Sequence, residues 1–326
     1  MSDTTPGTGV ASAAAVEPEA GRARGRRRKK PTGGLRDLRN LSGGDRVVIT
    51  LMWLIPTILV IGLVWLPALG SVVLSFARWE GLGGIDTIEW IGFENYKNVF
   101  TNYPPFWPAI QNNALLLVFL FLVPTVFGIF LAVLIDRELR GSRFYQTSYF
   151  LPVVLSLALV GFIWQLLYSK DQGLINAVFG TEIDWYGDPN INFYAVLVAV
   201  GWKQAGYIML IYLAGLKGVD PSLREAAKVD GATEWQTFFR VVFPVMLPIN
   251  IIVLVITVID SLRLFDLVWV INKGRNGLEL ISALVTQNIV GEASRIGFGS
   301  AMATIMLVIS TIFIIVYLRV IREDLK

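Results

Sequence analysis

The side chains in this sequence that can do chemistry are limited in kind. The chain of 326 residues has no cysteine and no histidine, which excludes thiol nucleophiles, imidazole bases, disulfides and Cys/His metal sites. What remains is a small set of charged, amide and hydroxyl side chains within long apolar stretches. Ionisable residues at such positions serve substrate paths or pair inside a helix bundle. We therefore predict a binding or transport role, with no catalytic residue and no metal site.

One basic residue interrupts an otherwise charge-free stretch, 191–216. At a helical rise of about 1.5 Å per residue, Lys203 lies roughly 18 Å into that stretch, near the middle of a bilayer. Tyr207 shares its helix face, and an ammonium donor beside an aromatic ring suits a sugar. We predict a substrate pathway lined by Lys203, Gln204, Tyr207, Asn250 and Thr257. The alternatives are that Lys203 pairs within the bundle or donates to a backbone carbonyl, and that the polar residues bond between helices.

Three charged residues follow one another at helical spacing further along the chain. Asp260, Arg263 and Asp266 lie at i, i+3 and i+6, so successive members can pair along one helix. Counted from Pro244, they lie about 24–33 Å along that helix, near the far membrane interface. We predict an outer gate or a structural ion cluster in preference to a sugar site.

Long apolar stretches determine which elements position these residues. Only 16% of the residues are charged, against about 25% in an average soluble domain, so lipid is the simpler solvent. A helix needs about 20 apolar residues to cross a bilayer. The sequence thus predicts an all-α membrane protein with six transmembrane helices, over 47–77, 109–135, 144–169, 191–216, 241–259 (continuing less cleanly to 271) and 296–318.

The distribution of basic residues predicts the orientation of these helices. The tail and the connections predicted to face the cytoplasm hold 20 of the 28 Lys and Arg residues, and the outer loops hold 6. Both termini are therefore expected in the cytoplasm. We interpret 1–45 as a disordered basic cytoplasmic tail in preference to a nucleic-acid-binding patch, and 46–326 as the membrane domain.

The cytoplasmic connection between the fourth and fifth spans is more than a linker. Asp220 is a suitable N-cap and Pro221 a suitable first residue for a short helix over 222–230. Gly231 can take the left-handed conformation that ends it. Thr233 and Gln236 form a capping box that starts a second helix, whose expected apolar face is Trp235, Phe238, Phe239 and Val242.

Such a short helix can be gripped by another protein. Ala226 and Ala227 permit close approach of a partner, and Glu225 adds a charge. The alternative is an amphipathic helix that rests on lipid.

The sequence of this loop resembles the EAA motif of ABC importer permeases. Glu225-Ala226-Ala227, three residues, Gly231, nine residues and then Val241-x-Phe243-Pro244 match its spacing, with apolar replacements at two positions. The resemblance makes 217–243 the coupling loop and assigns contacts with an ATPase to Glu225, Ala226, Ala227, Asp230, Gly231 and Pro244.

Further blocks resemble the maltose-type, binding-protein-dependent sugar permease family over roughly 47–326. Gly92-Phe93-Glu94-Asn95-Tyr96, Phe150-Leu151-Pro152, Gly173-Leu174-Ile175-Asn176 and Phe265-Asp266 carry it. One departure is 272–277, which reads Asn-Lys-Gly-Arg-Asn-Gly where the family has Thr-Gly-Gly-Gly-Pro, so the contacts of this outer loop are not carried over.

The resemblance implies a permease subunit, not an enzyme, in the plasma (inner) membrane of a bacterium or archaeon. Its partners would be a second homologous permease, two ATPase subunits that bind ATP and Mg, an extracellular solute-binding protein, lipid and a sugar or oligosaccharide, and no nucleic acid. The chain itself would hold no cofactor, and it lacks a phosphate-binding G-x-x-x-x-G-K-[ST] loop. The alternatives are an ABC permease for a non-sugar solute, an ATP-independent secondary transporter and, less favoured, a membrane enzyme.

Overall fold

The structure is a computed structural model that describes residues 43–82, 84–137, 140–291 and 294–324. It divides into two compact units, and the boundary in the chain lies between Leu59 and Val60. The first unit is described from Gly43, where α1 (Gly43–Val60) begins. The helix therefore starts within the predicted tail, and the remainder of that tail lies outside the described residues. None of the residues of α1 is buried.

Membrane-crossing length and apolarity are met by four helical segments of the described residues. They are Gly43–Leu74, which consists of α1, the π-helical turn η2 (Ile61–Trp65) and α2 (Leu66–Leu74); Phe106–Asp136; Asn192–Gly218; and Ile296–Tyr317. The second of these contains α4 (Phe106–Leu122) and α5 (Pro124–Asp136), the third is α9 (Asn192–Gly218) and the fourth lies in α16 (Ile296–Asp324).

The other two predicted spans are each broken. In the third, α6 (Ser142–Val154) and α7 (Leu157–Leu167) meet at an angle of 103°. In the fifth, Glu234–Val245 and Leu247–Asn272 meet at 75°. The predicted number of six is therefore met only if each bent pair crosses the membrane once. A continuous helix over 144–169 is wrong, because Leu155 and Ser156 are extended and the Ser156 side chain caps a new helix by accepting from the Leu159 amide at 3.2 Å.

The fifth segment is interrupted a second time at 264–265, between α13 and α14. In chain order it contains α11 (Glu234–Thr237), the π-helical turn η4 (Phe238–Val242), α12 (Phe243–Val245), α13 (Leu247–Arg263) and α14 (Asp266–Asn272). Pro244 has no amide hydrogen, so the regular i to i−4 ladder cannot continue through it. Short elements make up the remaining connections: β1 (Ala77–Arg78), η3 (Ile85–Thr87), β2 (Glu89–Trp90), α3 (Glu94–Thr101), α8 (Leu174–Phe179), α10 (Pro221–Val229) and α15 (Ile281–Ile289), with β1 and β2 antiparallel.

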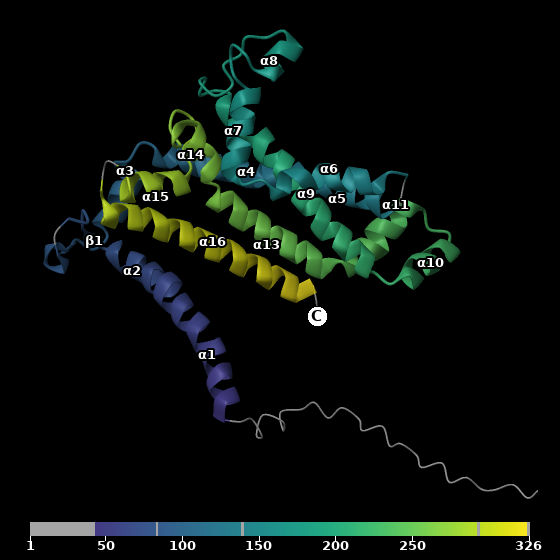
Figure 1. Cartoon of the computed structure of the whole chain (residues 1–326), viewed down its shortest axis with the longest axis horizontal. Coiled ribbons are helices and arrows are strands. Elements are labelled where there is room, and N and C mark those ends of the chain that lie inside the picture. Colours follow the sequence, from purple (N-terminus) through teal and green to yellow (C-terminus); the bar gives the residue numbers. More distant parts are fainter. Residues whose placement is uncertain (1–42, 83, 138–139, 292–293, 325–326) are drawn as a thin grey trace, which may run out of the picture. The chain divides into compact units, whose positions relative to one another are not determined.

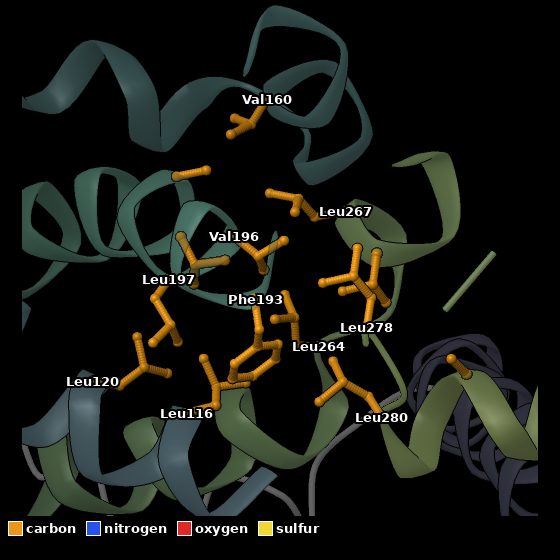
Figure 2. Close-up of a cluster of buried hydrophobic side chains, with 14 residues drawn as sticks. Leu116, Leu120, Val160, Phe193, Val196, Leu197, Leu264, Leu267, Leu278 and Leu280 are labelled. Carbon is orange, nitrogen blue, oxygen red and sulfur yellow. The ribbon is translucent and has the colours of Figure 1, made fainter. Parts of the chain in front are cut away.

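The apolar core of the second unit has two main parts. One gathers side chains from α4, α7, α9 and α14 and from the loop before α15, and Figure 2 shows Phe193 at its centre with Leu116, Leu264 and Leu280 around it. The other lies between α5, α9, η4 and α13 and includes Leu131, Ile208, Met209 and Val242. In Figure 1, α10 and α11 lie at one end of this unit and α3 and α15 at the other.

A close crossing joins α5 to α9. A Cβ atom added to Gly128 would lie 2.8 Å from both the Ala205 carbonyl oxygen and the Ile208 Cβ. Small residues allow membrane helices to approach closely, and van der Waals contact then holds them together without a hydrophobic driving force. The two helices thus form one packed pair. α10 contacts the end of α5, and α9 lines the charged cavity described below.

Candidate functional site

The loop that carries the predicted coupling residues folds from its own local signals. The Asp220 carboxylate accepts a hydrogen bond from the Ser222 amide at 2.9 Å, and Pro221 is the first residue of α10. Gly231 has a φ of 78°, and the Ala232 amide donates to the Ala227 carbonyl at 3.0 Å, which closes the C-terminal end of the helix. The N-cap, the glycine end and the Thr233–Gln236 capping box are all confirmed.

The predicted apolar face of the second helix is only partly buried. Phe238 and Val242 pack into the core between α5 and α9. Trp235 and Phe239 are exposed and stack on each other with ring centroids 5.9 Å apart. The change from α-helix to π-helix at Phe238 rotates successive side chains differently from the predicted period, so the four residues do not form one buried stripe.

The predicted coupling residues differ in their accessibility. Glu225, Ala226, Asp230, Gly231 and Pro244 are exposed, whereas Ala227 is buried. Of the two small residues, Ala226 is the one that a partner can approach. Within the described residues the Glu225 side chain makes no ion pair or hydrogen bond, so its charge is available at the surface.

Sequence reasoning missed a carboxylate that anchors this loop. Asp136, the last residue of α5, contacts the Arg224 Nη1 atom of α10 at 2.7 Å and the Lys217 Nζ atom of α9 at 3.4 Å. A second ion pair joins Arg137 to Glu234 at 2.5 Å. The only signals in the sequence were an acidic residue directly after a span and a basic residue directly before the EAA string, and neither indicates that the two are in contact.

Six of the eight charged and polar residues predicted within the spans line one cavity of about 420 Å³. It is lined by Lys203, Gln204 and Tyr207 of α9, by Asp260 and Arg263 of α13 and by Asp266 of α14, together with apolar side chains of α4, α6, α7 and α13. We predicted two separate places for these residues, a substrate path and an outer gate, and the structure puts them together.

The series Asp260, Arg263 and Asp266 does not run along a single helix. Leu264 has a ψ of 114°, which ends α13, and Asp266 begins α14. The Asp260 carboxylate accepts from the Gln204 amide at 3.3 Å, so it is held by α9 and not by a neighbour on its own helix. The continuous helix assumed for this series is therefore wrong.

Lys203 lies at the break between α6 and α7. Its ammonium donates to the Val153 carbonyl oxygen at 3.0 Å and also to that of Leu155. This is the second of the two uses expected for this lysine, hydrogen bonding to backbone carbonyls. The side chain also lines the cavity, so the same residue hydrogen-bonds the open carbonyls at the break and contributes charge to the cavity.

Two further predicted pathway residues lie away from this cavity. Thr257 is fully buried and its hydroxyl donates to the Val253 carbonyl of its own helix at 2.8 Å. Asn250 accepts from the Tyr212 hydroxyl at 2.7 Å and donates to the Phe243 carbonyl at 3.1 Å. Thr257 thus bonds within α13, whereas Asn250 joins α13 to α9 and to α12.

The proteins that this chain resembles in sequence and in fold are membrane subunits of ABC transporters. Residues 125–323 match the family described as "binding-protein-dependent transport system inner membrane component". A xylose/arabinose import permease of Haloferax volcanii is 32% identical over 84% of this chain and 87% of its own length. A probable starch degradation products transport permease of Thermoanaerobacterium thermosulfurigenes is 32% identical over 83% of this chain and 94% of its own. The fold matches, with a TM-score of 0.74 and 22% identity, a chain of a bacterial ABC transporter that imports the acidic polysaccharide alginate, over 89% of this chain and 99% of that one.

Proposed function

This chain belongs to the family of binding-protein-dependent transport system inner membrane components, and from that premise we propose that it carries a sugar or oligosaccharide across the membrane. It is a multi-pass ABC transporter permease subunit, not an enzyme. The sugar cargo is supported by relatives at 32% identity whose names specify xylose, arabinose and starch degradation products. A permease for a non-sugar solute is the second candidate, because the coupling loop alone does not distinguish cargoes.

The observation that carries the coupling role is the exposed, capped helix α10. It presents Glu225 and Ala226 at the surface, with the spacing of the EAA motif, and ends sharply at Gly231. We assign it to contact with a separate ATPase subunit, two of which would bind ATP and Mg. A second permease and an extracellular binding protein complete the assembly, with both termini of this chain in the cytoplasm of a bacterium or archaeon.

The mechanism we propose is alternating access. ATP binding brings the two ATPase subunits together and displaces α10, which moves as a rigid body because both of its ends are capped. The spans then open toward the outside and receive the cargo from the binding protein. The cavity around Lys203, Tyr207 and Asp260 offers an ammonium, an aromatic ring and a carboxylate to sugar hydroxyls.

The coupling role is tested in proteoliposomes that contain the complete complex. Glu225→Lys reverses the surface charge of α10 without touching a described contact of this chain. Gly231→Pro removes the amide that donates to the Lys228 carbonyl, and proline cannot adopt the φ of 78° that ends α10. We expect both to abolish ATP hydrolysis stimulated by the loaded binding protein. Full stimulation in both variants would exclude the coupling role, and transport without any ATPase subunit would favour a secondary transporter.

The pathway role is tested by a matched pair of α13 variants. Asp260→Asn removes a charge that lines the cavity, and Thr257→Val removes a hydroxyl that does not. Loss of a hydrogen bond of about 1 kcal/mol to cargo raises the half-saturating cargo concentration roughly fivefold in the first variant. Equal effects in both variants would contradict the assignment of the cavity.

A further inference from the structure

The carboxylate of Asp136 lies where three segments of the second unit meet. It ends α5, and its two oxygen atoms face different partners: Oδ2 faces Arg224 of α10 at 2.7 Å and Oδ1 faces Lys217 of α9 at 3.4 Å. The side chain of Asp136 is only 10% exposed, whereas those of Arg224 and Lys217 are 33% and 52% exposed. A shielded carboxylate that faces two cations is held more firmly than an ordinary surface ion pair.

Arg224 joins this carboxylate to a second backbone site. Its Nη2 atom donates to the carbonyl oxygen of Leu216, in the last turn of α9, at 3.2 Å. One planar guanidinium therefore spans α10, the end of α9 and the end of α5. A lysine cannot reproduce that fork, since its ammonium is a single point of charge.

These contacts surround a crevice of about 190 Å³ between α10, α11, η4 and the ends of α5 and α9. The buried Arg224 Nε and Thr237 Oγ1 atoms, both on residues that line it, find no hydrogen-bond partner among the residues that the structure describes. The interface is therefore not fully packed, and its charged contacts join α10 to the ends of α5 and α9 across this crevice. Arg137 and Glu234 add a more exposed ion pair on the same side.

We propose that Asp136 is a positioning residue for coupling, which fixes α10 to the packed α5–α9 pair so that a displacement of α10 reaches the spans. This inference rests on the proposed coupling role of α10. Without the carboxylate, α10 would remain joined to the spans by its flanking backbone at 217–220 and 230–233, by the single Arg224–Leu216 hydrogen bond and, through α11, by the exposed Arg137–Glu234 pair. An ATPase subunit would then still bind the loop, but the displacement of α10 would be absorbed by its flanking backbone and would not move the spans. The mechanical path continues along α9 to Lys203 and Gln204 at the cavity.

A first experiment tests whether Asp136 fixes α10 to the α5–α9 pair, which we call the Asp136 lock, and it does not depend on transport. Hydrogen exchange of the backbone amides over 221–231 is measured in the purified full chain in detergent, for Asp136→Asn and for Arg240→Gln. Arg240 is an exposed basic residue of η4 outside the crevice, so its loss is the control. We expect exchange to rise at least threefold in Asp136→Asn only. Unchanged exchange would overturn the proposal, whatever the protein transports.

A second experiment measures coupling in the complete complex in proteoliposomes. Asp136→Asn, Arg224→Gln and the double variant are compared for the number of ATP molecules hydrolysed per cargo molecule transported. We expect that number to rise about three- to tenfold in each single variant, in the range typical of site-to-site coupling, and to rise no further in the double variant. Arg224→Lys should fall between wild type and Arg224→Gln.

The outcomes separate the two proposals. A wild-type complex whose ATPase is not stimulated by the loaded binding protein would contradict the proposed function, and the exchange experiment would still decide the lock. A wild-type complex that is coupled, together with an equally coupled Asp136→Asn complex, would overturn the lock alone. Additive losses in the double variant would show that Asp136 and Arg224 act separately, which also contradicts it.

Discussion

The ammonium of Lys203 lies 3.0 Å from the carbonyl oxygen of Val153, fifty residues earlier in the chain. Val153 is in the last turn of α6, where a break of the helix leaves carbonyl groups without their usual amide partners. Leu159, whose amide would serve Leu155 in a continuous helix, donates to the Ser156 side chain instead. Lys203 therefore supplies, from α9, the hydrogen bonds that the α6–α7 break removes, at the end of the helix dipole that favours a cation.

Replacement of this ammonium should destabilise the break. Lys203→Met keeps the length and apolar stem of the side chain but leaves two carbonyl oxygens without a charged donor, which costs about 1–3 kcal/mol. We expect a lower midpoint of thermal unfolding in detergent, followed by tryptophan fluorescence. Lys170→Met, at an exposed position beyond α7, is the control and should not lower the midpoint. Equal midpoints for the two variants would show that the break does not need Lys203.

The crossing of α5 and α9 should not tolerate a single added methyl group. In Gly128→Ala the new Cβ would lie 2.8 Å from the Ala205 carbonyl oxygen, so the helices must separate. Overpacking of this kind costs about 1–3 kcal/mol. Gly218→Ala is the matched control, because it is also helical and has nothing within 4 Å of the added atom. Unfolding midpoints are compared, and an unaffected Gly128→Ala protein would contradict the close packing.

The end of α10 requires a left-handed residue for backbone reasons alone. Gly231 has a φ of 78°, and no atom of the described residues lies within 4 Å of an added Cβ, so Gly231→Ala costs conformational energy without a clash. We expect the conformational free energy that stabilises the end of α10 to fall by about 1 kcal/mol in Gly231→Ala. It should fall by less in Gly231→Asn, because asparagine tolerates this conformation. Limited proteolysis of the 217–243 loop measures the difference. Equal cleavage rates in the two variants would show that conformation is not limiting.

The N-cap of α10 should make this helix sensitive to acid. Hydrogen bonds from the Ser222 backbone amide, and then from its hydroxyl, hold the pKa of Asp220 below its ordinary value of 3.8. A carboxyl whose pKa is lower in the folded state stabilises that state above pH 3.8 and loses this contribution as the pH falls through the folded-state pKa. We expect faster amide exchange over 221–231, after correction for the intrinsic rate, as the pH drops below about 4. Asp220→Asn should remove this dependence, and a persistent dependence would point to another acid.

Local signals in the sequence predicted the coupling loop in detail. The N-cap at Asp220, the glycine end at Gly231 and the Thr233–Gln236 box each depend on a residue and its immediate neighbours, so the chain determines them without knowledge of the fold. The apolar stretches likewise predicted the segments with the length and apolarity to cross a bilayer, because a crossing helix needs about 20 apolar residues.

Contacts between distant residues were decided only by the tertiary structure. The sequence offered Lys203 and Asp260 as separate features, but only the packing of α9 against α6 and α13 places both beside one cavity. Asp136 was a span-ending acid like any other until Arg224 was found opposite it. Hydropathy is a property of a segment, whereas a break in a helix is stable only when distant donors satisfy its open backbone groups, and no single stretch of sequence carries that information.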